Sequence, residues 1–80
     1  LGSDSITGLA GQDILHGESG DDTLEAGAGE DTLYGDAGYD RLVGDTGRDT
    51  LYGGSDNDTL EGREDDDLLF GEAGNDWLSG

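Results

Sequence analysis

The sequence repeats itself every nine residues, and this period constrains the fold more than any other feature. An aliphatic residue recurs at one phase of the period, and an aspartate stands two residues before each of them. The aliphatic positions are Ile6, Leu15, Leu24, Leu33, Leu42, Leu51, Leu60, Leu69 and Leu78. The aspartates are Asp4, Asp13, Asp22, Asp31, Asp40, Asp49, Asp58, Asp67 and Asp76. A fixed period predicts a repeat architecture in which each unit packs on its neighbours.

Each repeat divides into a six-residue turn and a three-residue strand. The turns are rich in glycine, which adopts positive φ without steric cost. In a strand this short, one apolar side chain points inward between two that point outward. The predicted strands are 5–7, 14–16, 23–25, 32–34, 41–43, 50–52, 59–61, 68–70 and 77–79. Glycine recurs too often for a helix to develop.

Two turns carry aspartate where the other turns carry their last glycine. These residues are Asp56 and Asp65. Aspartate tolerates the left-handed region better than most residues, but less well than glycine. We therefore expect these two turns to be strained or reshaped.

The composition is that of a polyanion with little apolar material. Twenty-one acidic residues stand against three arginines, which gives a formal net charge of −18. Such a chain is typically disordered, so we expect it to be unfolded unless a cation binds the folded form. The charge argues against nucleic-acid partners and anionic membrane surfaces. No apolar run approaches the roughly 20 residues of a transmembrane helix, and no cysteine or targeting segment is visible.

The repeats resemble the RTX (repeats-in-toxin) nonapeptide, Gly-Gly-x-Gly-x-Asp-x-(aliphatic)-x, along the whole chain. The aspartate and the aliphatic residue match throughout, whereas the second glycine is retained only by Gly27 and Gly54. The resemblance implies an all-β fold, a right-handed parallel β-roll or β-solenoid of nine nonapeptide repeats. Two repeats form each coil, so consecutive turns fall on opposite edges.

The resemblance also implies Ca²⁺ between turns that are 18 residues apart. One turn supplies its carboxylate and the carbonyls two and four residues before it; the next supplies its carboxylate and the carbonyls three and five residues before it. On one edge the implied sites are Gly2 and Asp4 with Gly17, Ser19 and Asp22; Glu18, Gly20 and Asp22 with Gly35, Ala37 and Asp40; Asp36, Gly38 and Asp40 with Gly53, Ser55 and Asp58; and Gly54, Asp56 and Asp58 with Gly71, Ala73 and Asp76. On the other edge they are Leu9, Gly11 and Asp13 with Ala26, Ala28 and Asp31; Gly27, Gly29 and Asp31 with Gly44, Thr46 and Asp49; and Asp45, Gly47 and Asp49 with Gly62, Glu64 and Asp67.

These ligand sets predict up to about seven calcium ions, and six of the seven sites are complete. Carboxylates mixed with carbonyls are ligands that calcium prefers. Seven divalent ions would bring the net charge to about −4, which is ordinary for a small soluble domain. The alternative is that the acids only form a solvated face. Such a face has no reason to hold aspartate at one phase of the period.

The outward residues of the strands form two faces. On strands 14–16, 32–34, 50–52 and 68–70 we expect one stacked column of His16, Tyr34, Tyr52 and Phe70. We favour a ladder that stiffens the sheet, with a contact surface for a flanking domain, a second copy or a sugar as the alternative. On the other strands, flanking residues such as Arg41 and Val43 are expected to face solvent.

The resemblance implies a haemolysin-type calcium-binding module of a secreted, extracellular bacterial protein exported by a type I system. We expect residues 1–80 to be one repeat array cut from a longer protein whose flanking domains it contacts. The chain has no cysteine, no His-Glu-x-x-His and no Gly-x-Ser-x-Gly, so we do not expect an enzyme. The alternative function is adhesion or polysaccharide binding through the column of His16, Tyr34, Tyr52 and Phe70.

Overall fold

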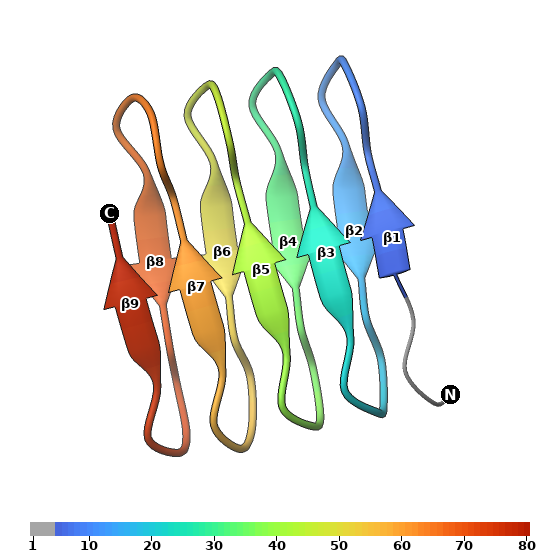
Figure 1. Ribbon diagram of the computed structural model, residues 1–80, viewed down its shortest axis with the longest axis vertical. Coiled ribbons are helices and arrows are strands. Elements are labelled where there is room, and N and C mark those ends of the chain that lie inside the picture. Colours follow the sequence, from blue (N-terminus) through green and yellow to red (C-terminus); the bar gives the residue numbers. More distant parts are fainter. Residues whose placement is uncertain (1–4) are drawn as a thin grey trace.

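Nine short strands form two parallel sheets that lie face to face (Figure 1). This computed structural model describes residues 5–80, so the implied ligands Gly2 and Asp4 lie outside the described residues. The strands are β1 (Ser5–Thr7), β2 (Ile14–His16), β3 (Thr23–Glu25), β4 (Thr32–Tyr34), β5 (Arg41–Val43), β6 (Thr50–Tyr52), β7 (Thr59–Glu61), β8 (Leu68–Phe70) and β9 (Trp77–Ser79). They coincide with the nine strands that the period predicts.

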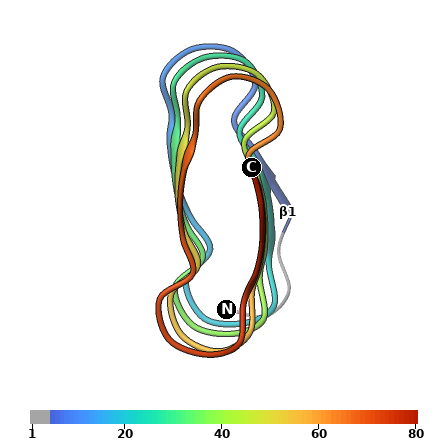
Figure 2. The same cartoon turned by 90° about the vertical axis from the view of Figure 1, so that its left-hand side faces the viewer.

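The odd-numbered strands make one sheet, β1-β3-β5-β7-β9, and the even-numbered strands make the other, β2-β4-β6-β8. Each strand pairs with the strand two places later, and Leu24 opposite Leu42 shows a shift of 18 residues per coil. The chain winds as a right-handed solenoid (Figure 1), and the coils superimpose as a flattened ring when seen along the axis (Figure 2). The predicted fold class is confirmed. Among residues 5–80 no helix is long and apolar enough to cross a membrane.

The turns gather on two opposite edges of the solenoid. We name each edge after one of its aspartates. The Asp31 edge, at the top of Figure 1, consists of turns 8–13, 26–31, 44–49 and 62–67; the Asp22 edge, at the bottom, consists of turns 17–22, 35–40, 53–58 and 71–76.

The core is a double column of single leucines. The side chains of Leu24, Leu33, Leu42, Leu51 and Leu60 are fully buried, and Ile6, Leu15 and Leu69 pack against them at the ends. Leu78 in the last strand is 45% exposed because no coil covers it. The prediction that this phase of the repeat faces inward is confirmed for the central coils.

The prediction that Val43 faces solvent is wrong. Val43 is fully buried, although it lies on the outer side of β5. Its neighbours in register are Glu25 and Glu61, whose side chains are longer. Glu61 is held in place by Arg41 at 3.3 Å and Arg63 at 3.2 Å. A short apolar side chain between two longer ones, of which Glu61 is held by arginines, loses its access to water.

The predicted aromatic column is confirmed on the face of the even-numbered strands. His16, Tyr34, Tyr52 and Phe70 stack with ring centroids 4.6, 4.9 and 5.0 Å apart and interplanar angles of 4–10°. This spacing is close to the distance between neighbouring strands, about 4.8 Å. The column therefore follows from the register of the sheet.

The second turn position requires a left-handed backbone even where it has lost glycine. Leu9 has φ of 74° and Arg63 has φ of 72°, and the other four non-glycine residues at this position also have positive φ. Left-handed residues with a Cβ carry strain that the surrounding structure must offset. The stacked coils impose the turn conformation on residues that do not prefer it.

Leu42→Ala should destabilise the calcium-saturated fold by about 2–5 kcal/mol, because the cavity lies between two coils that cannot collapse. Leu78→Ala is the matched control and should cost under about 1 kcal/mol, because that side chain already meets water. Urea unfolding followed by circular dichroism measures both. Equal losses for the two variants would contradict the burial described above.

Candidate metal sites between the coils

The aspartates that precede the strands are buried charges. Asp22, Asp31, Asp40, Asp49 and Asp58 are between 1% and 3% exposed. Each stands immediately before a strand, where the chain leaves the turn and joins the sheet. A carboxylate this deeply buried is costly unless hydrogen bonds or a cation compensate its charge.

One oxygen of each carboxylate joins consecutive coils. On the Asp22 edge, the backbone N–H of Asp22 donates to Oδ1 of Asp40 at 2.8 Å. The N–H of Asp40 donates to Oδ1 of Asp58, and the N–H of Asp58 to Oδ1 of Asp76, both at 2.8 Å. A continuous chain of hydrogen bonds therefore runs along this edge.

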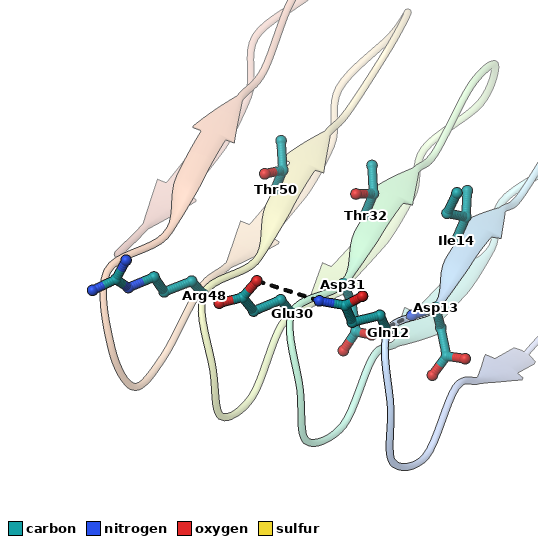
Figure 3. A pocket seen from close by; sticks show the side chains of 8 residues that line it. All are labelled: Gln12, Asp13, Ile14, Glu30, Asp31, Thr32, Arg48 and Thr50. Atoms are coloured by element: carbon teal, nitrogen blue, oxygen red, sulfur yellow. Dashed lines mark hydrogen bonds between the residues drawn. The ribbon is translucent and has the colours of Figure 1, made fainter.

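The Asp31 edge repeats the arrangement. The N–H of Asp13 donates to Oδ1 of Asp31 at 2.7 Å, that of Asp31 to Asp49 at 2.9 Å, and that of Asp49 to Asp67 at 2.8 Å. Figure 3 shows Asp13 and Asp31 in neighbouring coils of this edge. The six pairs so joined on the two edges are the pairs of the six complete predicted sites.

The other carboxylate oxygen is buried without a hydrogen-bond partner. Among residues 5–80 this holds for Oδ2 of Asp13, Asp31, Asp40, Asp49, Asp58 and Asp67. In the turns that begin with glycine, the Oδ2 atom points toward that glycine, whereas turn 26–31 begins with the buried Ala26. A Cβ on Gly35 would lie 2.7 Å from Oδ2 of Asp40 and 2.6 Å from the carbonyl oxygen of Gly53 in the next coil. At Gly35 a Cβ would be crowded because oxygens of two coils converge on that space.

Burial raises the pKa of these carboxyl groups. The pKa of Asp58 is raised from its usual 3.8 to about 7, and those of Asp40 and Asp49 to about 6. Loss of water is the largest cause; the backbone hydrogen bond opposes it, and repulsion from neighbouring carboxylates adds to it. The pKa values of Asp31 and Asp67 are raised for the same first reason. Each edge therefore favours the uptake of positive charge.

The oxygens present fit calcium. Within the described residues no three His, Cys, Asp or Glu side chains converge as an all-side-chain metal centre requires. Two carboxylates from successive coils do meet, and the turns around them carry backbone carbonyls. Calcium accepts mixed carboxylate and carbonyl oxygens in flexible geometry. When bound, it would neutralise the paired carboxylates and link the coils.

Several outer acids make contacts that the repeat pattern does not reveal. Asp36 accepts a hydrogen bond from the N–H of Glu18 through Oδ2 at 3.2 Å, and Asp21 accepts one from Tyr39 through Oδ1 at 2.9 Å. These residues occupy variable positions of the repeat, so their partners become visible only when the coils are stacked.

A shallow, open cavity of about 430 Å³ runs along the Asp31 edge (Figure 3). Gln12 and Glu30 form a hydrogen bond of 3.5 Å across it, and the side chain of Arg48 points away from Glu30 (Figure 3). Its lining residues are Gln12, Asp13, Ile14, Glu30, Asp31, Thr32, Arg48 and Thr50. The cavity is part of the surface above the buried aspartates.

Comparison with protein families matches the chain to the RTX calcium-binding nonapeptide repeat. The match comprises four copies, which lie in residues 1–33, 16–51 and 52–80. Comparisons with curated proteins and with solved structures gave no match.

The metal-free chain should gain β structure as the pH falls from about 7 to about 4. The raised pKa values mean that the metal-free folded state binds more protons than the unfolded state. Its stability therefore increases as these carboxyls are protonated and is lost as the pH rises through about 7. Circular dichroism of the calcium-depleted chain measures this. A calcium-saturated sample is the control and should stay unchanged from about pH 8 to 5, and a metal-free β signal that weakens on acidification would contradict the expectation.

Proposed function

Because the chain belongs to the RTX calcium-binding nonapeptide-repeat family, we propose that it folds on binding Ca²⁺ and stabilises a secreted bacterial protein exported by a type I system. The observation that carries this proposal is the buried Oδ2 without a hydrogen-bond partner on aspartates between coils such as Asp40, Asp49 and Asp58. An ion that binds only the folded chain stabilises it by a free energy that rises with the logarithm of the free ion concentration once this exceeds Kd. Folding and metal binding are then coupled coil by coil, because each site joins two neighbouring coils.

We further propose that the ligands are the carboxylates and carbonyls of turn pairs in successive coils. In the centre of the Asp22 edge, an ion would take Asp36, Gly38 and Asp40 from one turn and Gly53, Ser55 and Asp58 from the next. The same pattern on both edges gives up to about seven ions. Asp40 serves two of these sites, because it is the later carboxylate of one pair and the earlier carboxylate of the following pair.

The secretory role follows from the same coupling. RTX repeats are typical of secreted bacterial proteins. With a net charge of −18 and one leucine per strand in the core, the chain stays unfolded where calcium is scarce and passes an export channel in that state. In external calcium it folds, and the array supports the flanking domains of a longer protein.

Catalysis has no place in this proposal, since the family is a structural calcium-binding module. The alternative of sugar binding through His16, Tyr34, Tyr52 and Phe70 receives less support from the geometry. A sugar stacks on the face of an aromatic ring, and the faces of Tyr34 and Tyr52 already lie against neighbouring rings. The stacking favours a ladder that stiffens the sheet.

Circular dichroism should show coil in chelator and β structure after addition of Ca²⁺, with no effect of Mg²⁺. Magnesium demands a smaller octahedral site and gives up its water reluctantly, so it does not replace calcium between flexible turns. A β signal of equal size in chelator at neutral pH would refute the proposal.

Asp40→Ala should remove two calcium sites and Asp76→Ala one, because Asp40 lies between two turn pairs and Asp76 ends its edge. Each lost ion removes about 2.7 kcal/mol of stability when free calcium is about 100 times Kd. Calorimetric titration counts the ions, and urea unfolding measures the stability. Identical titrations of the two variants would contradict the shared-carboxylate arrangement.

A further inference from the structure

The turns 53–58 and 62–67 differ from the others at their fourth position. Glycines at this position, such as Gly38 and Gly74, have φ of 110° and 99°, whereas Asp56 and Asp65 have φ of 73° and 70°. A Cβ on Gly38, Gly47 or Gly74 would collide with a carbonyl oxygen of the preceding coil. The turns that carry aspartate must therefore be displaced, as their altered φ values indicate.

The displaced turn at Asp56 is bonded directly to the turn 18 residues earlier. The N–H of Ser55 donates to the carbonyl oxygen of Asp36 at 3.0 Å. The N–H of Gly38 donates to Oδ2 of Asp56 at 3.2 Å. Two direct hydrogen bonds within the chain thus link the outer parts of these turns.

The turn at Asp65 is bonded in the same way on the opposite edge. The N–H of Glu64 donates to the carbonyl oxygen of Asp45 at 3.1 Å, and the N–H of Gly47 donates to Oδ2 of Asp65 at 2.9 Å. Arg63 adds an ion pair with Asp45 at 3.2 Å. Among the described turn pairs, only these two contain an amide-to-carbonyl bond at this position.

We propose that Asp56 and Asp65 join the turn pairs 35–40/53–58 and 44–49/62–67 by direct hydrogen bonds that need no metal, and that the calcium sites of these two pairs fill last. We call each such directly bonded pair a clamp. This inference rests on the proposed function, in which the carbonyls of Asp36 and Asp45 are calcium ligands. Each of these oxygens already accepts an amide proton from the facing turn. The positive end of that amide dipole opposes a cation at the same oxygen, so the ion must weaken or displace the bond.

An NMR titration of the full chain with CaCl₂ tests the order of filling. The reporters are the backbone amides at the third turn position, which are Ala28, Ala37, Thr46, Ser55, Glu64 and Ala73. The amides of Ser55 and Glu64 should reach half-change at about fivefold higher free calcium than the other four, the factor that corresponds to one ordinary hydrogen bond. A common midpoint for all six would overturn the proposal.

Three variants separate the effect of the direct hydrogen bonds at Asp65 from the effect of its negative charge. Asp65→Gly restores the glycine of the repeat and should bring the midpoint of Glu64 to that of Thr46, while Ser55 stays late. Asp66→Gly removes one negative charge and one Cβ from the neighbouring exposed position. In this variant the midpoint of the Glu64 amide should stay at the higher calcium concentration. Asp65→Asn keeps the Cβ and the acceptor oxygen, so the midpoint of the Glu64 amide should again stay at the higher calcium concentration.

The outcomes also distinguish this inference from the proposed function. If no amide responds to calcium, the proposed function fails and the clamp proposal fails with it. A second outcome is that all amides respond to calcium but Asp66→Gly lowers the midpoint of the Glu64 amide as much as Asp65→Gly does. Calcium binding is then supported and the clamp proposal is overturned. If only Asp65→Gly advances Glu64, the clamp proposal is supported.

Discussion

The buried carboxylate between consecutive coils is the interaction on which this fold depends. Asp40 illustrates it: its amide donates to Asp58, its Oδ1 accepts from Asp22, and its Oδ2 is buried without a hydrogen-bond partner. A carboxylate with one satisfied oxygen holds two coils in register but carries an uncompensated charge into a poorly hydrated place. The coils are therefore held in register, but the negative charge of buried carboxylates such as that of Asp40 is not compensated by a positive group of the described residues. A cation at each turn pair, as proposed above, would resolve that imbalance.

The thin core makes this imbalance decisive. Each strand contributes one inward side chain, and each coil contacts only its two neighbours. Stability in such an array is approximately a sum of intrinsic and nearest-neighbour contributions. In the central coils the leucines are equally buried and the strand pairing is the same, so these coils differ mainly in their turns. Whatever occupies the two edges decides whether the stack holds together.

The period alone was sufficient to predict the strands and the inward aliphatic residues, because a strict repeat places equivalent residues in line. The register of 18 residues, and with it the column that includes Tyr34 and Tyr52, came from the resemblance, which implies two repeats per coil. The period was not sufficient for Val43, whose burial depends on the length of Glu25 and Glu61 in the adjacent coils. The aspartate pairs that hydrogen bonds join across successive coils are the pairs that the resemblance implies, whereas their role as calcium ligands stays a prediction. The direct bonds of the outer acids were not predictable, since they depend on how far a particular turn is displaced.

The placement of the arginines leaves the charge of the buried aspartates to be compensated by an external cation, as the proposed function requires. Every ion pair of Arg41 and Arg63 in residues 5–80 uses an outer acid, Glu61 or Asp45, and none reaches the buried aspartates of the repeat. An arginine beside a buried aspartate would compensate its charge permanently and would stabilise the roll without metal. A chain that keeps its few cations on the outside preserves the charge imbalance inside. The proposed coupling between folding and calcium therefore depends on the absence of arginine from the buried aspartates of the described coils as much as on the aspartates themselves.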